Sequence, residues 1–99
     1  MVIDCSNIFI SSNDIFNLKE NIFLEKYHTG LNYIIISDPN FLTLLKCKYP
    51  YYSFILSPYL PKEEITDELI NSCSYVINYY NDINTKIPKN KLIIMFPIN

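Results

Sequence analysis

Short runs of β-branched and aromatic residues recur along this 99-residue chain, and most are too short to form a packed helix. Polar stretches or prolines separate the runs, and helical patterns of apolar residues fill three of the gaps. The expected strands lie within Val2–Ile10, Tyr33–Ser37, Tyr52–Leu56, Tyr75–Asn78 and Leu92–Phe96. Strands that alternate with helices favour an α/β fold on a mainly parallel sheet.

Three helices are expected between these strands. The first begins at the Ser-Asn pair of positions 12 and 13, repeats apolar residues at spacings of three and four, and stops at Gly30. The second takes Asp38 as its N-cap, has a proline in its first position and ends before Pro50. The third, Lys62–Ser72, carries acidic residues in its first turns, where negative charge suits the helix dipole.

Composition excludes several classes of function. The net charge of −2 and the scattered lysines argue against electrostatic binding to nucleic acid. The single glycine, Gly30, excludes glycine-rich phosphate loops and dinucleotide fingerprints. The N-terminus lacks the pattern of a signal peptide and no apolar run has the length of a membrane span, so we expect a cytoplasmic protein without direct membrane insertion.

The residue types that are often catalytic in other proteins, such as cysteine and histidine, form no recognisable catalytic set in this sequence. Cys5, Cys47 and Cys73 are odd in number and far apart, so we expect reduced, buried thiols rather than disulfides or a zinc site. The only histidine, His28, lies at the end of the first helix, where it is expected to act as a cap rather than as a base.

Acidic side chains near strand ends raise the question of a metal site. Asp4 and Asp38 lie at strand ends, where open α/β sheets place their sites. Acids of the third helix, Glu63, Glu64 and Asp67, could join them around Mg²⁺. N-capping by Asp38 and the helix dipole explain these acids sufficiently, so the sequence predicts neither a metal nor a cofactor.

From Leu31 onward the chain resembles the small globular rotor subunit in the central stalk of V-type (vacuolar) proton ATPases. The segments that carry the resemblance, in the order of the family, are Tyr33–Asp38 with Phe41–Leu45, Tyr52–Leu56 with Lys62–Asp67, Tyr75–Ile83, and Lys91–Asn99. The chain departs from the family because the C-terminal helical tail is missing and residues 1–30 add a strand and a helix. The resemblance therefore implies an N-terminal extension (1–30) and a domain like the rotor subunit (31–99).

The fold expected on this basis is a mainly parallel sheet of about four strands flanked by helices, Rossmann-like or flavodoxin-like, plus the N-terminal strand-helix unit. The implied function is non-catalytic: the protein packs on the coiled-coil shaft of the V-ATPase rotor and helps couple ATP hydrolysis to proton transport. The implied place is a hetero-oligomeric complex on the cytosolic face of vacuolar membranes. The corresponding partner interface comprises Asn78, Tyr79, Tyr80, Asn81 and Ile83.

Two alternatives remain open. Val2–Asn7 resembles the D-x-S-N motif of NYN/PIN-type ribonucleases, and Phe23–Thr29 resembles their next unit, but Cys73 and the Tyr79–Tyr80 pair fall where later acids would be needed. The other alternative is an α/β module that only binds proteins. All of these interpretations use the same expected strands. We therefore expect the following apolar residues to lie on central strands: Ile35, Phe54, Ile77 and Ile94.

Overall fold

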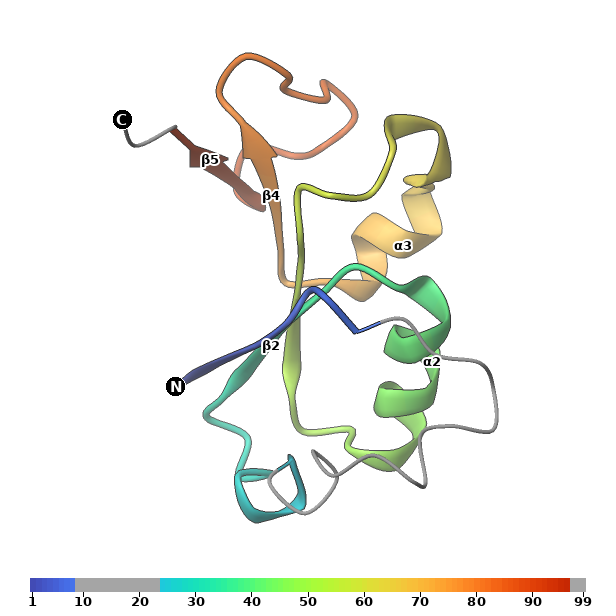
Figure 1. Cartoon of the computed structure of the whole chain (residues 1–99), viewed down its shortest axis with the longest axis vertical. Coiled ribbons are helices and arrows are strands. Elements are labelled where there is room, and N and C mark those ends of the chain that lie inside the picture. The colour runs from blue at the N-terminus through green and yellow to red at the C-terminus, as the bar shows by residue number, and fades with distance from the viewer. Residues whose placement is uncertain (9–23, 97–99) are drawn as a thin grey trace.

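The computed structural model describes residues 1–8 and 24–96, which form a sheet with helices packed against it (Figure 1). The elements are strands β1 (Val2–Cys5) and β2 (Tyr33–Ile36), helix α2 (Pro39–Lys48), strand β3 (Ser53–Leu56), the 3₁₀ helix η2 (Lys62–Glu64), helix α3 (Asp67–Ser72), and strands β4 (Tyr75–Tyr79) and β5 (Leu92–Met95). The first predicted helix falls largely on 9–23, outside the described residues. None of the described helices has the length and apolar character of a membrane span.

All five strands run parallel, in the order β1-β2-β3-β4-β5. The N-terminal strand belongs to the same sheet, because β1 pairs with β2 from Val2 opposite Tyr33 to Cys5 opposite Ile36. The α/β class and the additional N-terminal strand are thereby confirmed. The division into residues 1–30 and 31–99 stays a prediction.

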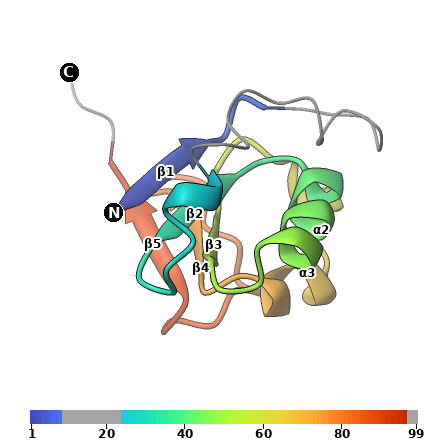
Figure 2. The ribbon, with the colours of Figure 1, turned by 90° about the horizontal axis from the view of Figure 1, so that it is seen from below.

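The sequential strand order places the helices on one face of the sheet. When successive parallel strands are neighbours, right-handed crossovers are expected to pass the same face of the sheet. Figure 2 shows α2 and α3 together on one side of the sheet. Flavodoxin-like sheets instead reverse their strand order and carry helices on both faces. The fold is therefore a two-layer arrangement within the predicted α/β class.

The hydrophobic core lies between the sheet and this helical layer. Phe41 and Leu45 of α2 are fully buried against Ile34 and Ile36 of β2, and all four have no exposed surface. The alternation along β2 shows that one face of the strand packs in the core, whereas the intervening residues are half-buried. The continuous apolar run Tyr33–Ile36 thus has one face in the core, and the described helices do not cover the other face.

The predicted core residues divide according to their position in the sheet. Phe54 and Ile77 are buried on β3 and β4, as predicted, and Ile35 is half-buried on β2. Ile94 is 44% exposed, so the prediction that it lies on a central strand is wrong. The reason is topological: β5 is an edge strand, and only β4 flanks it.

Helix α2 begins and ends where the sequence predicts. The carboxylate of Asp38 accepts a hydrogen bond of 3.0 Å from the backbone N–H of Asn40, and Pro39 occupies the first turn. These contacts satisfy one of the free N–H groups at the helix start and supply a preset backbone angle. The helix ends at Lys48, and Tyr49 follows as its C-cap, before Pro50.

The third predicted helix is divided into η2 and α3. Ile65 has an extended backbone and is 3% exposed, so its side chain enters the core. The hydroxyl of Thr66 then accepts a 3.1 Å hydrogen bond from the N–H of Leu69 and starts α3. The prediction of one continuous helix over Lys62–Ser72 is wrong, because this anchor and the new N-cap interrupt it.

Candidate functional site

The two acids at strand ends each close a local turn. The carboxylate of Asp4 accepts a 2.9 Å hydrogen bond from the N–H of Ser6, and the Ser6 side chain and backbone lower the pKa of this carboxyl group. Asp38 is engaged as the N-cap of α2. Both carboxylates therefore have a structural role in which backbone N–H groups, rather than a metal, satisfy them.

Of the acids proposed as further metal ligands, Glu64 lines a hollow of about 540 Å³ together with Asp38, beside the carboxyl end of β2. Glu63, Glu64 and Asp67 are exposed on η2 and at the start of α3. Among residues 1–8 and 24–96, no group of three or more His, Cys, Asp or Glu side chains could hold a metal ion. Between the ends of β2 and β3, the buried hydroxyls of Ser37 and Ser57 hydrogen-bond to each other. The described residues thus supply no acidic cluster for the nuclease alternative.

His28 belongs to an aromatic cluster rather than to a helix cap. Its Nε2 accepts a 2.8 Å hydrogen bond from the backbone N–H of Tyr51, which requires that nitrogen to be unprotonated. Its ring stacks on Tyr51 and Tyr52, with centroids 5.0 and 5.4 Å away. The capping prediction for His28 is corrected, because its ring holds the turn before β3 instead of the last carbonyls of a helix.

The cysteines divide by burial. Cys5 and Cys73 are free and buried, as predicted, whereas Cys47 is free and exposed on α2. Burial raises the pKa of the Cys73 thiol to about 11, although Lys46 and Lys91 act in the opposite direction. The neutral form therefore predominates at physiological pH, and Cys73 lacks the lowered pKa of a nucleophilic thiol.

The predicted interface segment contains one buried residue. Asn78 is 7% exposed, and its Oδ1 accepts a 2.9 Å hydrogen bond from the N–H of Asn84. Its Nδ2 donates to the carbonyl of Ile77 at 2.9 Å. Asn78 therefore fixes the loop that follows β4, and its part in a partner interface stays a prediction.

The other four residues of that segment have some exposure. Tyr80 and Ile83 are 47% and 39% exposed, Asn81 is exposed, and Tyr79 is half-buried. The ring of Tyr80 stacks on Phe96, with centroids 5.4 Å apart. These residues can contact a partner, and their part in an interface stays a prediction.

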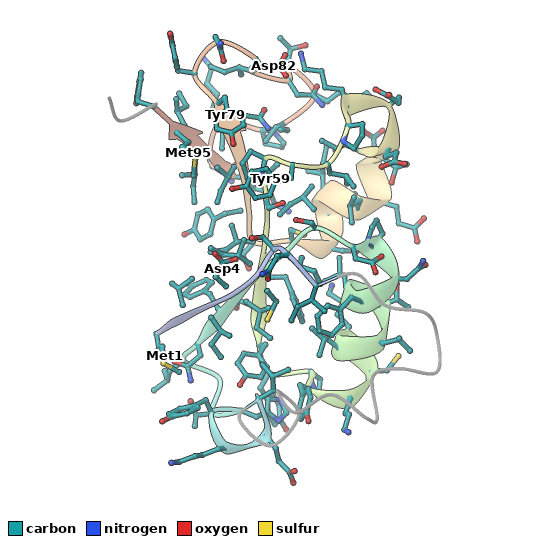
Figure 3. The ribbon with its side chains drawn as sticks, in the orientation of Figure 1. Met1, Asp4, Tyr59, Tyr79, Asp82 and Met95 are labelled. Carbon is teal, nitrogen blue, oxygen red and sulfur yellow. The ribbon has the colours of Figure 1, made fainter. Side chains whose placement is uncertain are left out.

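The larger surface that the sequence analysis missed is the sheet face away from the helices, here called the open face. By strand register and alternation it consists of Val2, Asp4, Tyr33, Ile35, Ser53, Ile55, Tyr75, Ile77, Tyr79, Ile93 and Met95. Figure 3 shows Asp4 and Met95 on the side opposite α2. Asp4 is the one charged residue in this set.

Several large apolar residues of the open face are exposed to solvent. The exposed fractions are 55% for Val2, 37% for Tyr75, 38% for Ile93 and 39% for Met95. The rings of Tyr33 and Tyr75 approach to 6.2 Å between centroids. Contiguous apolar surface of this kind marks interaction sites. Period-two alternation in the strands could have revealed it, but the continuous β-branched runs conceal that period.

The tyrosine of the open face that also belongs to the predicted interface segment is Tyr79. Partial burial and the neighbouring Tyr59 raise the pKa of its phenol, so the group is uncharged at neutral pH. The open face and the exposed part of the predicted segment therefore adjoin at the end of β4.

Comparison of the chain with known protein families, curated proteins and solved structures gives no match.

Proposed function

We propose that this chain is a non-catalytic protein-interaction subunit that packs its open face against a helical partner. The observation that carries the proposal is the exposed apolar surface on the open face of an all-parallel sheet: Val2, Tyr75, Ile93 and Met95 are 37–55% exposed, whereas the central Ile55 and Ile77 are each 7% exposed. All-parallel sheets occur almost only with both faces covered. Among the described residues, α2 and α3 cover one face and no helix lies over the other. A partner helix would complete the usual three layers.

The chemistry of the open face defines the partner. A helix that packs on a sheet buries an apolar stripe, and Tyr75, Ile93 and Met95 offer the complementary apolar contacts. Asp4 lies at the β1 side of this face, and its lowered pKa keeps it ionised at neutral pH. We therefore expect an amphipathic partner helix with a lysine or arginine at the edge of its apolar stripe.

The resemblance to the V-ATPase rotor family suggests a specific partner of this chemistry. In the proposal, the open face packs on the coiled-coil shaft of a V-type proton ATPase. The chain then turns with the shaft in a hetero-oligomeric complex at the cytosolic face of the membrane and hydrolyses nothing itself. The ordered sequence motifs and the α/β class support this assignment.

The test is binding of the purified chain to the coiled-coil shaft protein encoded in the same genome, measured by calorimetry. Ile93→Asp places a charge on the open face, and we expect about 30-fold weaker binding, the loss typical of an interface hot spot. Thr43→Asp adds the same charge on the exposed side of α2 and should leave binding unchanged. Circular dichroism verifies that both variants are folded.

Two outcomes would contradict the proposal in different ways. Wild-type affinity of a folded Ile93→Asp variant would show that the open face is not the interface. The double variant Tyr79→Ala/Tyr80→Ala then tests whether the segment after β4 takes that role. Failure of the unmodified chain to bind the shaft would refute the rotor assignment.

A further inference from the structure

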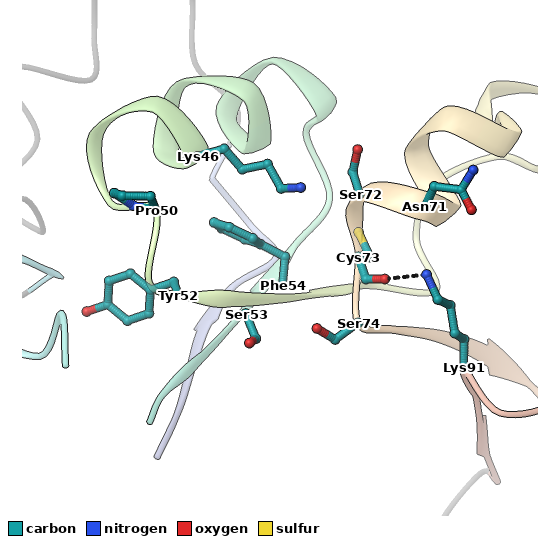
Figure 4. Close-up of a pocket in the computed structure, with 10 residues that line it drawn as sticks. All are labelled: Lys46, Pro50, Tyr52, Ser53, Phe54, Asn71, Ser72, Cys73, Ser74 and Lys91. Carbon is teal, nitrogen blue, oxygen red and sulfur yellow. Dashed lines mark hydrogen bonds between the residues drawn. The ribbon is translucent and has the colours of Figure 1, made fainter. Parts of the chain in front are cut away.

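A cavity of about 610 Å³ lies at the amino ends of β3 and β4 (Figure 4). The two strands pair through Ile55 opposite Tyr75 and Leu56 opposite Val76, and Tyr75 is the first residue of β4, so Ser53 and Phe54 of β3 have no partner in β4. The N–H of Ser74, just before β4, donates a 2.8 Å hydrogen bond to the carbonyl of Phe54. The cavity lies beside these first two residues of β3, and the ends of α2 and α3 border it.

The polar lining of this cavity is cationic. Lys46 from the last turn of α2 and Lys91 from the segment before β5 supply two ammonium groups. The hydroxyl of Ser74 and the amide of Asn71 add hydrogen-bond donors, whereas the hydroxyl of Ser72 already donates to the carbonyl of Glu68 at 2.9 Å. The described lining contains no Asp or Glu, although the chain as a whole carries a net charge of −2. This arrangement favours an anionic occupant, since lysines act as point charges toward phosphate.

One of the two lysines is held in place by the fold. The Nζ of Lys91 donates to the carbonyls of Ile70 and Cys73 at 3.2 and 3.0 Å. These bonds satisfy carbonyl groups at the C-terminal end of α3. An ammonium group has three N–H donors, so one donor of Lys91 remains for a ligand. Figure 4 shows this lysine beside Cys73.

The second lysine can complete the site from the opposite side. Figure 4 shows the side chain of Lys46 running from α2 above Phe54 toward α3. Its Nζ makes no hydrogen bond or ion pair among the described residues. Cys73 lies between the lysines, and its thiol is uncharged at neutral pH because burial raises its pKa to about 11. No anion of the described lining therefore competes for the two cations.

We propose that this cavity binds a small phosphate monoester, with the phosphate between Lys46 and Lys91 and an apolar group against Phe54. Two cations match the two charges of a phosphate dianion, and the cavity volume lies within the range of ligand pockets, about 300–1,000 Å³. The aromatic wall and the hydroxyl groups suit a ligand larger than free phosphate. The site shares Ser53 with the open face, but neither lysine belongs to that face, so substitution of Lys46 tests the site separately from the proposed function.

The test uses the ¹⁵N-labelled full chain and three probes: phenyl phosphate, inorganic phosphate and neutral benzyl alcohol. We expect phenyl phosphate to shift the amide resonances of residues 71–74 and to bind more tightly than either other probe. Lys46→Gln should weaken its binding about tenfold, as loss of a charged hydrogen bond does. Lys86→Gln removes the same charge from an exposed loop position outside the cavity and should leave binding unchanged.

The results that would overturn the proposal are equally specific. Equal weakening by Lys46→Gln and Lys86→Gln would show attraction to the overall charge instead of a site. Equal binding of benzyl alcohol and phenyl phosphate would show an apolar pocket without anion recognition. Absence of any shift in residues 71–74 with phenyl phosphate would refute the site itself.

Discussion

The two faces of the sheet should differ in how much they contribute to stability, and a pair of isoleucines tests this. Ile36 on β2 has no exposed surface, whereas Ile93 on β5 lies on the open face and is 38% exposed. Ile36→Ala loses the transfer free energy of the side chain and leaves a cavity, so we expect a cost of about 2–5 kcal/mol. Ile93→Ala loses part of that transfer term and leaves no enclosed cavity, so about 1 kcal/mol is expected.

Urea unfolding followed by circular dichroism measures both costs on the isolated chain. A domain of this size has a total stability of about 5–15 kcal/mol, so Ile36→Ala removes a large share of it. The same loss should lower the melting temperature by about 4–8 °C for each kcal/mol. Equal costs for the two variants would show that the open face is covered in the isolated chain. A cost below about 1 kcal/mol for Ile36→Ala would refute the assigned core.

Two further predictions concern a helix cap and a buried thiol. Asp38→Ala should lower the free energy of unfolding, measured in urea, by about 1 kcal/mol because the N–H of Asn40 loses its acceptor. Asp38→Asn keeps an acceptor and should lose less stability. Equal losses for the two variants would contradict the capping role. The pKa of Cys73 rises from 9.0 to about 11 on folding, so the unfolded chain loses this proton first and stability should fall between those pH values. Cys73→Ala should flatten that pH dependence in urea titrations, and an unchanged slope would contradict it.

Local signals in the sequence were sufficient for most elements of the fold. The Asp38-Pro39 pair predicted the start of α2 because N-capping depends on neighbours two residues away. The break in the third helix escaped prediction because it depends on where Ile65 packs. Its acidic surroundings suited a helix, and Thr66 was a capping residue within an otherwise helical pattern. The tertiary packing of Ile65 decided between one continuous helix and a break before Thr66.

The candidate sites depend on contacts between residues that are far apart in the sequence, and no local sequence pattern predicts such contacts. Lys46 and Lys91 line the same cavity because the first two residues of β3 have no partner in β4 and the end of α2 lies near the segment before β5. Prediction of the open face would have required the strand order, since the same strands in a reversed order would carry helices on both faces. The hydrogen bond between the Asn78 amide and the N–H of Asn84, which holds the loop after β4, likewise depends on a fold that no local pattern of residues 78–83 predicts.

The strand order also bears on the carboxyl edge of the sheet, where Asp38 and Glu64 line a hollow but no group of three or more potential metal ligands forms among the described residues. Ligand crevices in open α/β sheets form where the strand order reverses and neighbouring connections leave on opposite faces. In a sequential sheet, successive right-handed connections leave on the same face, so no such divergence arises. The polar groups at this edge instead satisfy each other, as Ser37 does with Ser57 and Asp38 does with Asn40. The two proposed recognition surfaces therefore lie elsewhere: on the sheet face that no described helix covers, and in the cavity beside the amino end of β3.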